Sequence, residues 1–177
     1  ERIDQTDWQD EALRTGRLRN ASLSFSGGSD KVRYFASGNI GLNEGMLVSN
    51  GLEKNGGRLN LDFDATSRLK VGVGLSLART FTRQVSNDNA FSTPLQLIAL
   101  SPITPKRDED GVLYDRPVTT YYNGLIDVED GQRKVHTLRT LANVFGDYKI
   151  TENLGLRVEG AANLYNVRDD AYFGDRT

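Results

Sequence analysis

Two acidic clusters are the first candidates for chemistry in this sequence. Asp108, Glu109 and Asp110 precede Gly111, and a similar acidic group ends at Gly131. Clustered carboxylates suit a hard cation such as Ca²⁺, which takes oxygen ligands. Neither cluster has the alternate-position ligands and the distal glutamate of an EF-hand, so solvated acidic loops explain both more simply. We therefore predict no metal site and no cofactor.

Residues that could support catalysis are few. Asp62 and Asp64 share one face of a predicted strand, but a glycosidase needs two carboxylates at a defined separation on a rigid frame. His136 is the single histidine and has no visible partner, so we expect it at a strand edge. The chain has no cysteine, which excludes disulfides and thiolate ligands. No nucleophile motif or phosphate-binding loop is present, so we predict that the chain is not an enzyme.

The remaining candidates lie in a long segment with little pattern, residues 82–135. Tyrosines there could stack on sugars, pack on a protein partner, or pack within the loop itself. We predict a contact site for a ligand or a protein partner, and its members are Tyr114, Tyr121, Tyr122, Asp108 and Asp110. The net charge of −2 gives no reason to expect nucleic acid as a partner.

Stretches of alternating apolar and polar residues flank this segment. Period two is typical of β-strands, whose successive side chains point to opposite faces. The six stretches are residues 20–26, 32–43, 58–65, 68–81, about 136–150 and 154 to about 167. Gly27 and Gly28 supply the positive backbone angles that a tight hairpin between the first two requires. We expect Trp8, before the first strand, to be a packing anchor, and Thr6 to cap a short helical turn.

The connections between these stretches alternate in length: short, long, short, very long and short. A loop of about a dozen residues, or ragged strand ends around one, follows Glu44. Outer-membrane barrels have tight turns at one end and long loops at the other, whereas a soluble sandwich has no reason to keep that alternation. A strand of fourteen residues, tilted by ~40°, covers ~36 Å along the barrel axis, enough to cross a ~25 Å apolar band.

The two faces of the predicted strands also differ. Lys70 and Arg157 lie on the polar face, where a sandwich core could not bury them unpaired but a water-filled lumen would hydrate them. Tyr34, Phe63 and Tyr148 lie near strand ends, where an interfacial aromatic girdle would form. A soluble β-sandwich adhesin or carbohydrate-binding module, with one exposed polar face per sheet, produces the same alternation and is the alternative interpretation.

Part of the sequence is similar to a known family. The segments concerned are Thr6–Glu11, Arg14–Gly16 and Leu23–Gly28, then Lys31, Tyr34 and Ser37, and Asn43–Gly45. Together they resemble the start of the barrel, just after the plug, in SusC/RagA-like TonB-dependent outer-membrane transporters of Bacteroidetes. Looser similarity continues through Arg58–Asp62, Ala99–Pro102 and Leu154–Leu156.

The resemblance implies an all-β, antiparallel up-and-down meander that forms about the first six strands of a 22-stranded transmembrane β-barrel in the outer membrane. Its parts would be a lead-in after the plug (residues 1–18), strands 1–4 (residues 19–81), a long extracellular loop (residues 82–135), strands 5–6 (residues 136–169) and the start of the next outer loop (residues 170–177). The implied function is nutrient import of glycans or peptides. The implied partners are a SusD-like surface lipoprotein, the TonB complex through a part outside this sequence, the substrate and membrane lipid.

Overall fold

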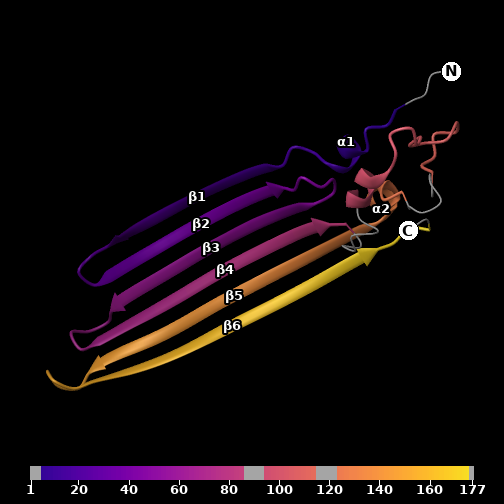
Figure 1. The fold of residues 1–177 in the computed structure, drawn as a ribbon. Helices are drawn as coiled ribbons and strands as arrows, with labels where there is room; N and C mark the ends of the chain where they lie inside the picture. The colour runs from indigo at the N-terminus through magenta and orange to yellow at the C-terminus, as the bar shows by residue number, and fades with distance from the viewer. Residues whose placement is uncertain (1–4, 86–93, 115–122, 176–177) are drawn as a thin grey trace.

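The structure is a computed structural model that describes residues 5–85, 94–114 and 123–175. In this part of the chain, six long antiparallel strands form one sheet in strict sequence order (Figure 1). The strands are β1 (Arg17–Gly28), β2 (Val32–Glu44), β3 (Gly51–Asp64), β4 (Leu69–Gln84), β5 (Gln132–Lys149) and β6 (Gly155–Tyr172). The predicted all-β antiparallel meander is confirmed.

Two ends of the sheet can be distinguished, and both names are kept below. The turn end carries the short connections, residues 29–31, 65–68 and 150–154. Gly27 and Gly28, expected to form the first turn with positive backbone angles, instead pair with β2 at the end of β1 and have no positive φ, so that expectation is wrong. The loop end carries the other two connections and three short helical elements (Figure 1). These elements are α1 (Trp8–Ala12), the 3₁₀ helix η1 (Pro94–Ala99) and α2 (Leu125–Asp130).

The second connection is shorter than predicted. β3 already begins at Gly51, so only residues 45–50 join it to β2, and the prediction of a loop of about a dozen residues is wrong. Gly56 and Gly57, interpreted as loop residues, lie inside β3 opposite Asn39 and Gly38. Glycine in a strand makes room for a neighbour: a Cβ on Gly56 would come within 2.6 Å of Asn39 Oδ1.

Three strands also continue beyond the apolar alternation that predicted them. β4 runs on to Gln84 and β5 starts at Gln132, because pairing between these strands continues as far as Gln84 and Arg133. β6 extends to Tyr172. Backbone hydrogen bonds do not require an apolar side chain, so the pattern in the sequence marks only the part of each strand with one apolar face.

The three short turns are staggered along the sheet. The stagger can be measured by following the last residue pair before each turn across the ladder to β4. The last pair of the β1–β2 hairpin lies opposite Gly72, that of the β3–β4 hairpin includes Lys70, and that of the β5–β6 hairpin lies opposite Arg68. The offset is therefore two residues per hairpin, or one per strand. With ~3.4 Å per residue and ~4.8 Å between strands, this corresponds to a tilt of ~35°, as in the strands of transmembrane barrels.

Neither face of the sheet is covered by the described residues. Large apolar side chains on one face stay open, with Phe25 60% and Val158 63% exposed. The buried apolar residues lie outside the strands. A sandwich would bury one face against a second sheet, so the sandwich alternative is wrong for the described chain. Among these residues, no helix is long and apolar enough to cross a membrane.

Candidate functional site

The apolar face of the sheet forms a band of limited width. Because the strands are in continuous register, its side chains line up in rows across them. One central row is Phe25, Ala36, Leu59, Leu75, Ala142 and Ala162. Apolar residues run from Leu69 to Leu77 on β4 and from Val32 to Leu42 on β2. At ~3.4 Å per residue and a tilt of ~35°, these stretches cover ~22–28 Å, close to the ~25 Å apolar band of an outer-membrane barrel.

Aromatic side chains lie near both borders of this band. Tyr34, Phe63 and Tyr148 are on the apolar face, each within two residues of its strand's turn end, as predicted. Towards the loop end, Phe81 stacks on His136 with 4.5 Å between ring centroids. The structure therefore places His136 within β5, whereas a strand-edge position was expected; β5 begins earlier than the alternation indicated.

The opposite face of the sheet, the polar face, carries an ionic cluster near the turn end. The Arg157 guanidinium lies 2.9 Å from Asp147 and 3.4 Å from Glu159, and 4.2 Å from the centroid of the Phe145 ring. All three charged side chains are more than a third exposed, so the pairs add little to stability. Their chemical effect is a fixed pattern of charge in any water-filled space that this face bounds.

A glycine positions part of this cluster. Phe145 lies across Gly72, where an added Cβ would come within 2.1 Å of the ring and 2.9 Å of Asp62 Oδ1. Asp62 in turn lies 3.9 Å from Arg33. The carboxylate of Asp62 is thus part of the charged surface of the polar face, in agreement with its predicted position there.

An apolar cluster at the loop end joins the start of the chain to the long connection. Trp8 is buried, and its indole Nε1 donates a hydrogen bond to the Ser101 carbonyl at 3.1 Å. The other members are Ala12, Leu97, Leu100, Leu113, Leu125 and Ile126. Glu11 and Lys106 form an ion pair of 2.6 Å beside it. Trp8 is therefore the packing anchor that its position predicted, and it holds α1 at the loop end.

The cap of α1 differs from the prediction. The Asp7 carboxylate accepts hydrogen bonds from the Gln9 and Asp10 backbone N–H groups at 3.0 and 3.3 Å. Asp7 is thus the N-cap, and the expectation for Thr6 is wrong. The Thr6 N–H instead donates to the Pro102 carbonyl at 2.8 Å, because extended backbone before the helix pairs with the long connection.

Two acidic side chains of α2 are used within the fold. Glu129 forms an ion pair with Arg107. Asp127 is buried in α2, and this burial raises the pKa of its carboxyl. In the same region, Asn123 is fully buried, and its Nδ2 has no hydrogen-bond partner among the residues that the structure describes. Across the described residues, no group of three potential ligand side chains could hold a metal ion.

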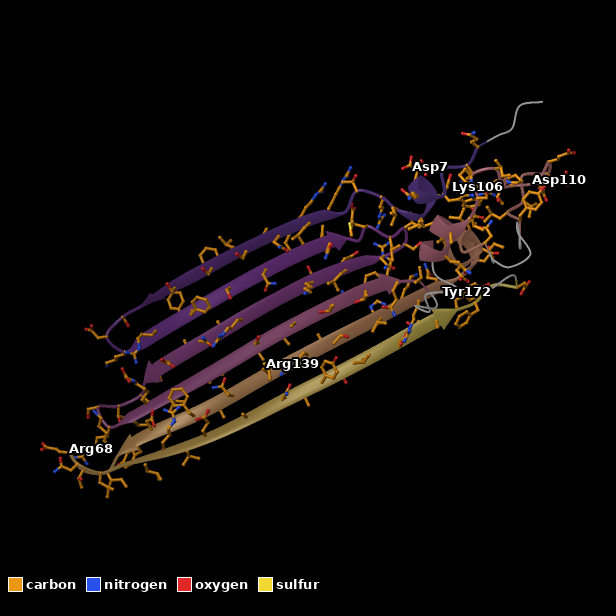
Figure 2. All side chains as sticks on the ribbon, in the orientation of Figure 1. Asp7, Arg68, Lys106, Asp110, Arg139 and Tyr172 are labelled. Carbon is orange, nitrogen blue, oxygen red and sulfur yellow. The ribbon has the colours of Figure 1, made fainter. Side chains whose placement is uncertain are left out.

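The predicted contact site is placed only in part. Asp108 and Asp110 lie in a tight loop in which the chain reverses direction. This reversed segment, residues 107–114, is closed by an isolated antiparallel β-bridge between Arg107 and Leu113. Asp108 Oδ1 accepts the Val112 N–H at 2.8 Å, so this carboxylate is engaged within its own loop. Asp110 is exposed at the tip, at the opposite end of the molecule from Arg68 of the turn end (Figure 2).

Of the three predicted tyrosines, the structure describes one, Tyr114. Tyr114 is 38% exposed and lies at the end of the same reversed segment. Tyr121 and Tyr122 lie outside the described residues. The structure therefore brings Asp108, Asp110 and Tyr114 onto one exposed segment of the loop end.

Sequence reasoning missed the structural centre of this end. The buried Asp127, the ion pair of Lys106 with Glu11 and the apolar cluster were not predicted. A usable signal was present: the pair Leu125–Ile126 and the apolar residues of η1 stand out in an otherwise polar segment.

Comparisons with known proteins bear on this arrangement. The chain is 42% identical over 81 residues to TonB-dependent receptor P3 of Formosa agariphila, and 31% identical over 105 residues to TonB-dependent receptor P26 of the same organism. These matches cover 46% and 59% of this chain, but the chain spans only 8% and 10% of the two relatives. No family model matches.

Solved structures give the same picture for the fold. The structure of the RagAB peptide importer in its closed-closed state matches with a TM-score of 0.75 over 94% of this chain, at 22% identity. A further structure of the RagAB peptide transporter matches with a TM-score of 0.74 over 95% of the chain. Each match covers 20% of the solved chain. The names of all these proteins denote receptors and transporters, which fits a non-enzyme.

The exposed apolar band, the staggered strands and the two kinds of similarity agree with one another. They confirm the predicted barrel class and outer-membrane location. By sequence and by fold, the resemblance to a segment of a SusC/RagA-like TonB-dependent transporter is thereby confirmed for this chain.

Proposed function

We propose that this chain forms part of the wall of an outer-membrane, TonB-dependent nutrient importer. The observation that carries the proposal is the contrast between the two faces of a single staggered sheet. One face presents an apolar band of bilayer thickness, and the other presents charged side chains that need water. In a closed barrel, which we propose has 22 strands, the first face meets lipid and the second lines the lumen.

The loop end faces outward in this proposal. Outer-membrane barrels have short periplasmic turns, so the connections 29–31, 65–68 and 150–154 face the periplasm. The connection between β4 and β5 then forms a long extracellular loop, and the chain beyond β6 leads into the next. Since α1 packs at the loop end, the described part of the lead-in, residues 5–18, is also outside. If a plug domain in the lumen precedes this sequence, the chain must cross to the outer side between the plug and α1.

The outward end is where a partner and a substrate would be met. We propose a SusD-like surface lipoprotein as the partner and a glycan or a peptide as the substrate. The fold similarity to a peptide importer supports the inclusion of peptides among the proposed substrates. We propose that Asp110 and Tyr114, which are exposed at this end, contact either of them, together with Asp108, Tyr121 and Tyr122. TonB would act through a part of the protein outside this sequence.

Thiol labelling of the full-length protein in whole cells tests the orientation. The chain contains no cysteine, so single positions can be addressed in it. Asp110→Cys at the loop end should react with a membrane-impermeant maleimide in intact cells. Asn153→Cys, exposed at the turn end, should react only after the outer membrane is permeabilised. The reverse result would overturn the orientation.

Growth tests the importer itself. A deletion strain supplied with single glycans or single peptides as the nutrient should lose growth on one class and regain it with the full-length gene. Unimpaired growth of the deletion strain on every nutrient of both classes would contradict the proposed role.

A further inference from the structure

A groove crosses the apolar face at the border of the apolar band that lies towards the loop end, where charged side chains such as Arg79 begin. Its floor is formed by Gly38 and Gly57, which lie directly opposite each other on β2 and β3. Leu23 and Leu77 flank the two glycines in the same row and form its walls. The groove has a volume of about 540 Å³, which lies within the ~300–1,000 Å³ of typical ligand sites.

The two glycines of the floor differ from Gly72 and Gly74 on the opposite face, whose side-chain space is filled by neighbours. At Gly72, an added Cβ would meet the Phe145 ring at 2.1 Å, so a neighbouring side chain already fills that space. At Gly38 and Gly57, the nearest heavy atoms to an added Cβ are backbone oxygens, at 3.8 and 3.6 Å. Glycine weakens a strand interior and often marks a close approach by another molecule. The space above this pair is therefore open to an occupant.

One end of the groove is polar. Asn55 and Arg79 lie opposite each other in the next row towards the loop end, and both line the groove. The side chain of Arg79 is exposed and forms no ion pair or hydrogen bond with any residue that the structure describes. The next arginine along β4, Arg83, is instead paired with Glu53 at 3.3 Å. Arg79 is thus a cation available to a ligand at the groove.

Resting on the proposed function, we propose that this groove binds a phosphorylated membrane lipid. One acyl chain lies over Gly38 and Gly57, between Leu23 and Leu77, and the headgroup phosphate accepts hydrogen bonds from the guanidinium of Arg79. An arginine fork matches the geometry of a phosphate and forms charge-assisted bonds with it. On β4, Arg79 is the first charged residue of this face beyond the apolar band, so its charge lies at the depth where headgroups begin.

Lipid binding by the purified full-length transporter tests the proposal. The probes are dioleoylphosphatidic acid and dioleoylglycerol, which share their chains and differ in the phosphate. Native mass spectrometry from detergent micelles measures the binding of each. Arg79→Gln should weaken binding of phosphatidic acid about tenfold, as expected for one charge-assisted contact, and leave dioleoylglycerol unchanged. Gly57→Leu, which fills the groove, should weaken binding of both lipids.

Gly160→Leu is the matched control. Gly160 lies on the same face but outside the groove, and the nearest atom to an added Cβ is Val144 Cγ1 at 3.9 Å. This variant should bind both probes as the wild type does. Equal binding by the wild type and all three variants would overturn the proposal. A loss with Gly57→Leu but not with Arg79→Gln would overturn the phosphate contact and with it the proposal as stated.

Failure of the proposed function would look different. The wild-type protein would then be absent from the outer-membrane fraction of cells. If the wild type is found there and the substitutions leave lipid binding unchanged, only the lipid site is wrong.

Discussion

A charge placed at the middle of the apolar band should impair assembly in the membrane. On β4 the band runs from Leu69 to Leu77, so Val73 is its central residue on that strand. Eight residues at ~3.4 Å and a tilt of ~35° place Val73 ~11 Å from either border. The side chain of Val73 is 46% exposed. The residues opposite it, Leu61 and Val144, are apolar and offer no polar partner to a charged side chain at this position. An arginine there would have to enter hydrocarbon or distort the bilayer to reach water.

The expected cost for Val73→Arg is ~2–4 kcal/mol, the range for arginine at the midplane of a barrel's lipid face. This corresponds to about a 30- to 1,000-fold change in the folding equilibrium. The assay is reversible unfolding of the full-length protein in lipid vesicles by denaturant, monitored by tryptophan fluorescence. Outer-membrane abundance in cells provides a second measurement.

Ala161→Arg is the control for this prediction. Ala161 lies on the polar face of β6, opposite Asn143. An arginine there would point into the water-filled lumen, so we expect little change in the free energy of unfolding. If the two variants lose the same free energy, or if Ala161→Arg loses more, the assignment of the two faces is refuted.

Three further outcomes are expected at the loop end. Trp8→Ala should destabilise the apolar cluster by ~3–5 kcal/mol, as for large buried aromatics, and hydrogen exchange should quicken around Ser101 but not in the strands. Burial raises the pKa of Asp127, so the folded loop end binds this proton more tightly than the unfolded segment does. The contribution of Asp127 to stability should therefore be fully present below its ordinary pKa of 3.8 and be lost as the pH rises through the folded pKa. Hydrogen exchange measured at several pH values should lose this contribution in Asp127→Asn. Tyr114→Ala combined with Asp110→Ala should weaken binding of the proposed SusD-like lipoprotein in a pull-down while leaving outer-membrane abundance unchanged.

The alternation of apolar and polar side chains was sufficient to predict that the six strands exist. In a strand with one face in lipid and one in water, every second residue is apolar. It could not predict that β3 starts at Gly51. Glycine and asparagine are typical of loops, but here Gly56 gives up its side-chain space to Asn39, and this depends on the register of two strands. The ionic cluster around Arg157 depends on register in the same way, since its partner Asp147 lies on the neighbouring strand.

The loop end was the least predictable part for a different reason. Its buried apolar cluster comes from four short segments with no shared period, and they meet only through contacts between distant parts of the chain. Trp8 illustrates this: its type indicated an anchor, but nothing in the sequence identified Ser101 as the acceptor of its hydrogen bond. Of the proposed contact residues, the exposure of Asp110 agrees with a loop tip, whereas the engagement of the Asp108 carboxylate required the geometry of its turn.

The central claim is that one face of this sheet meets lipid and the other meets water. A cysteine scan of β4 in the full-length protein, in native outer membranes, tests it most directly. Cysteine at Lys70, Ser76 and Ala78 should react with a water-soluble maleimide, and cysteine at Val71, Val73 and Leu75 should not. Reactivity without this alternation, or with the reverse alternation, would contradict the account.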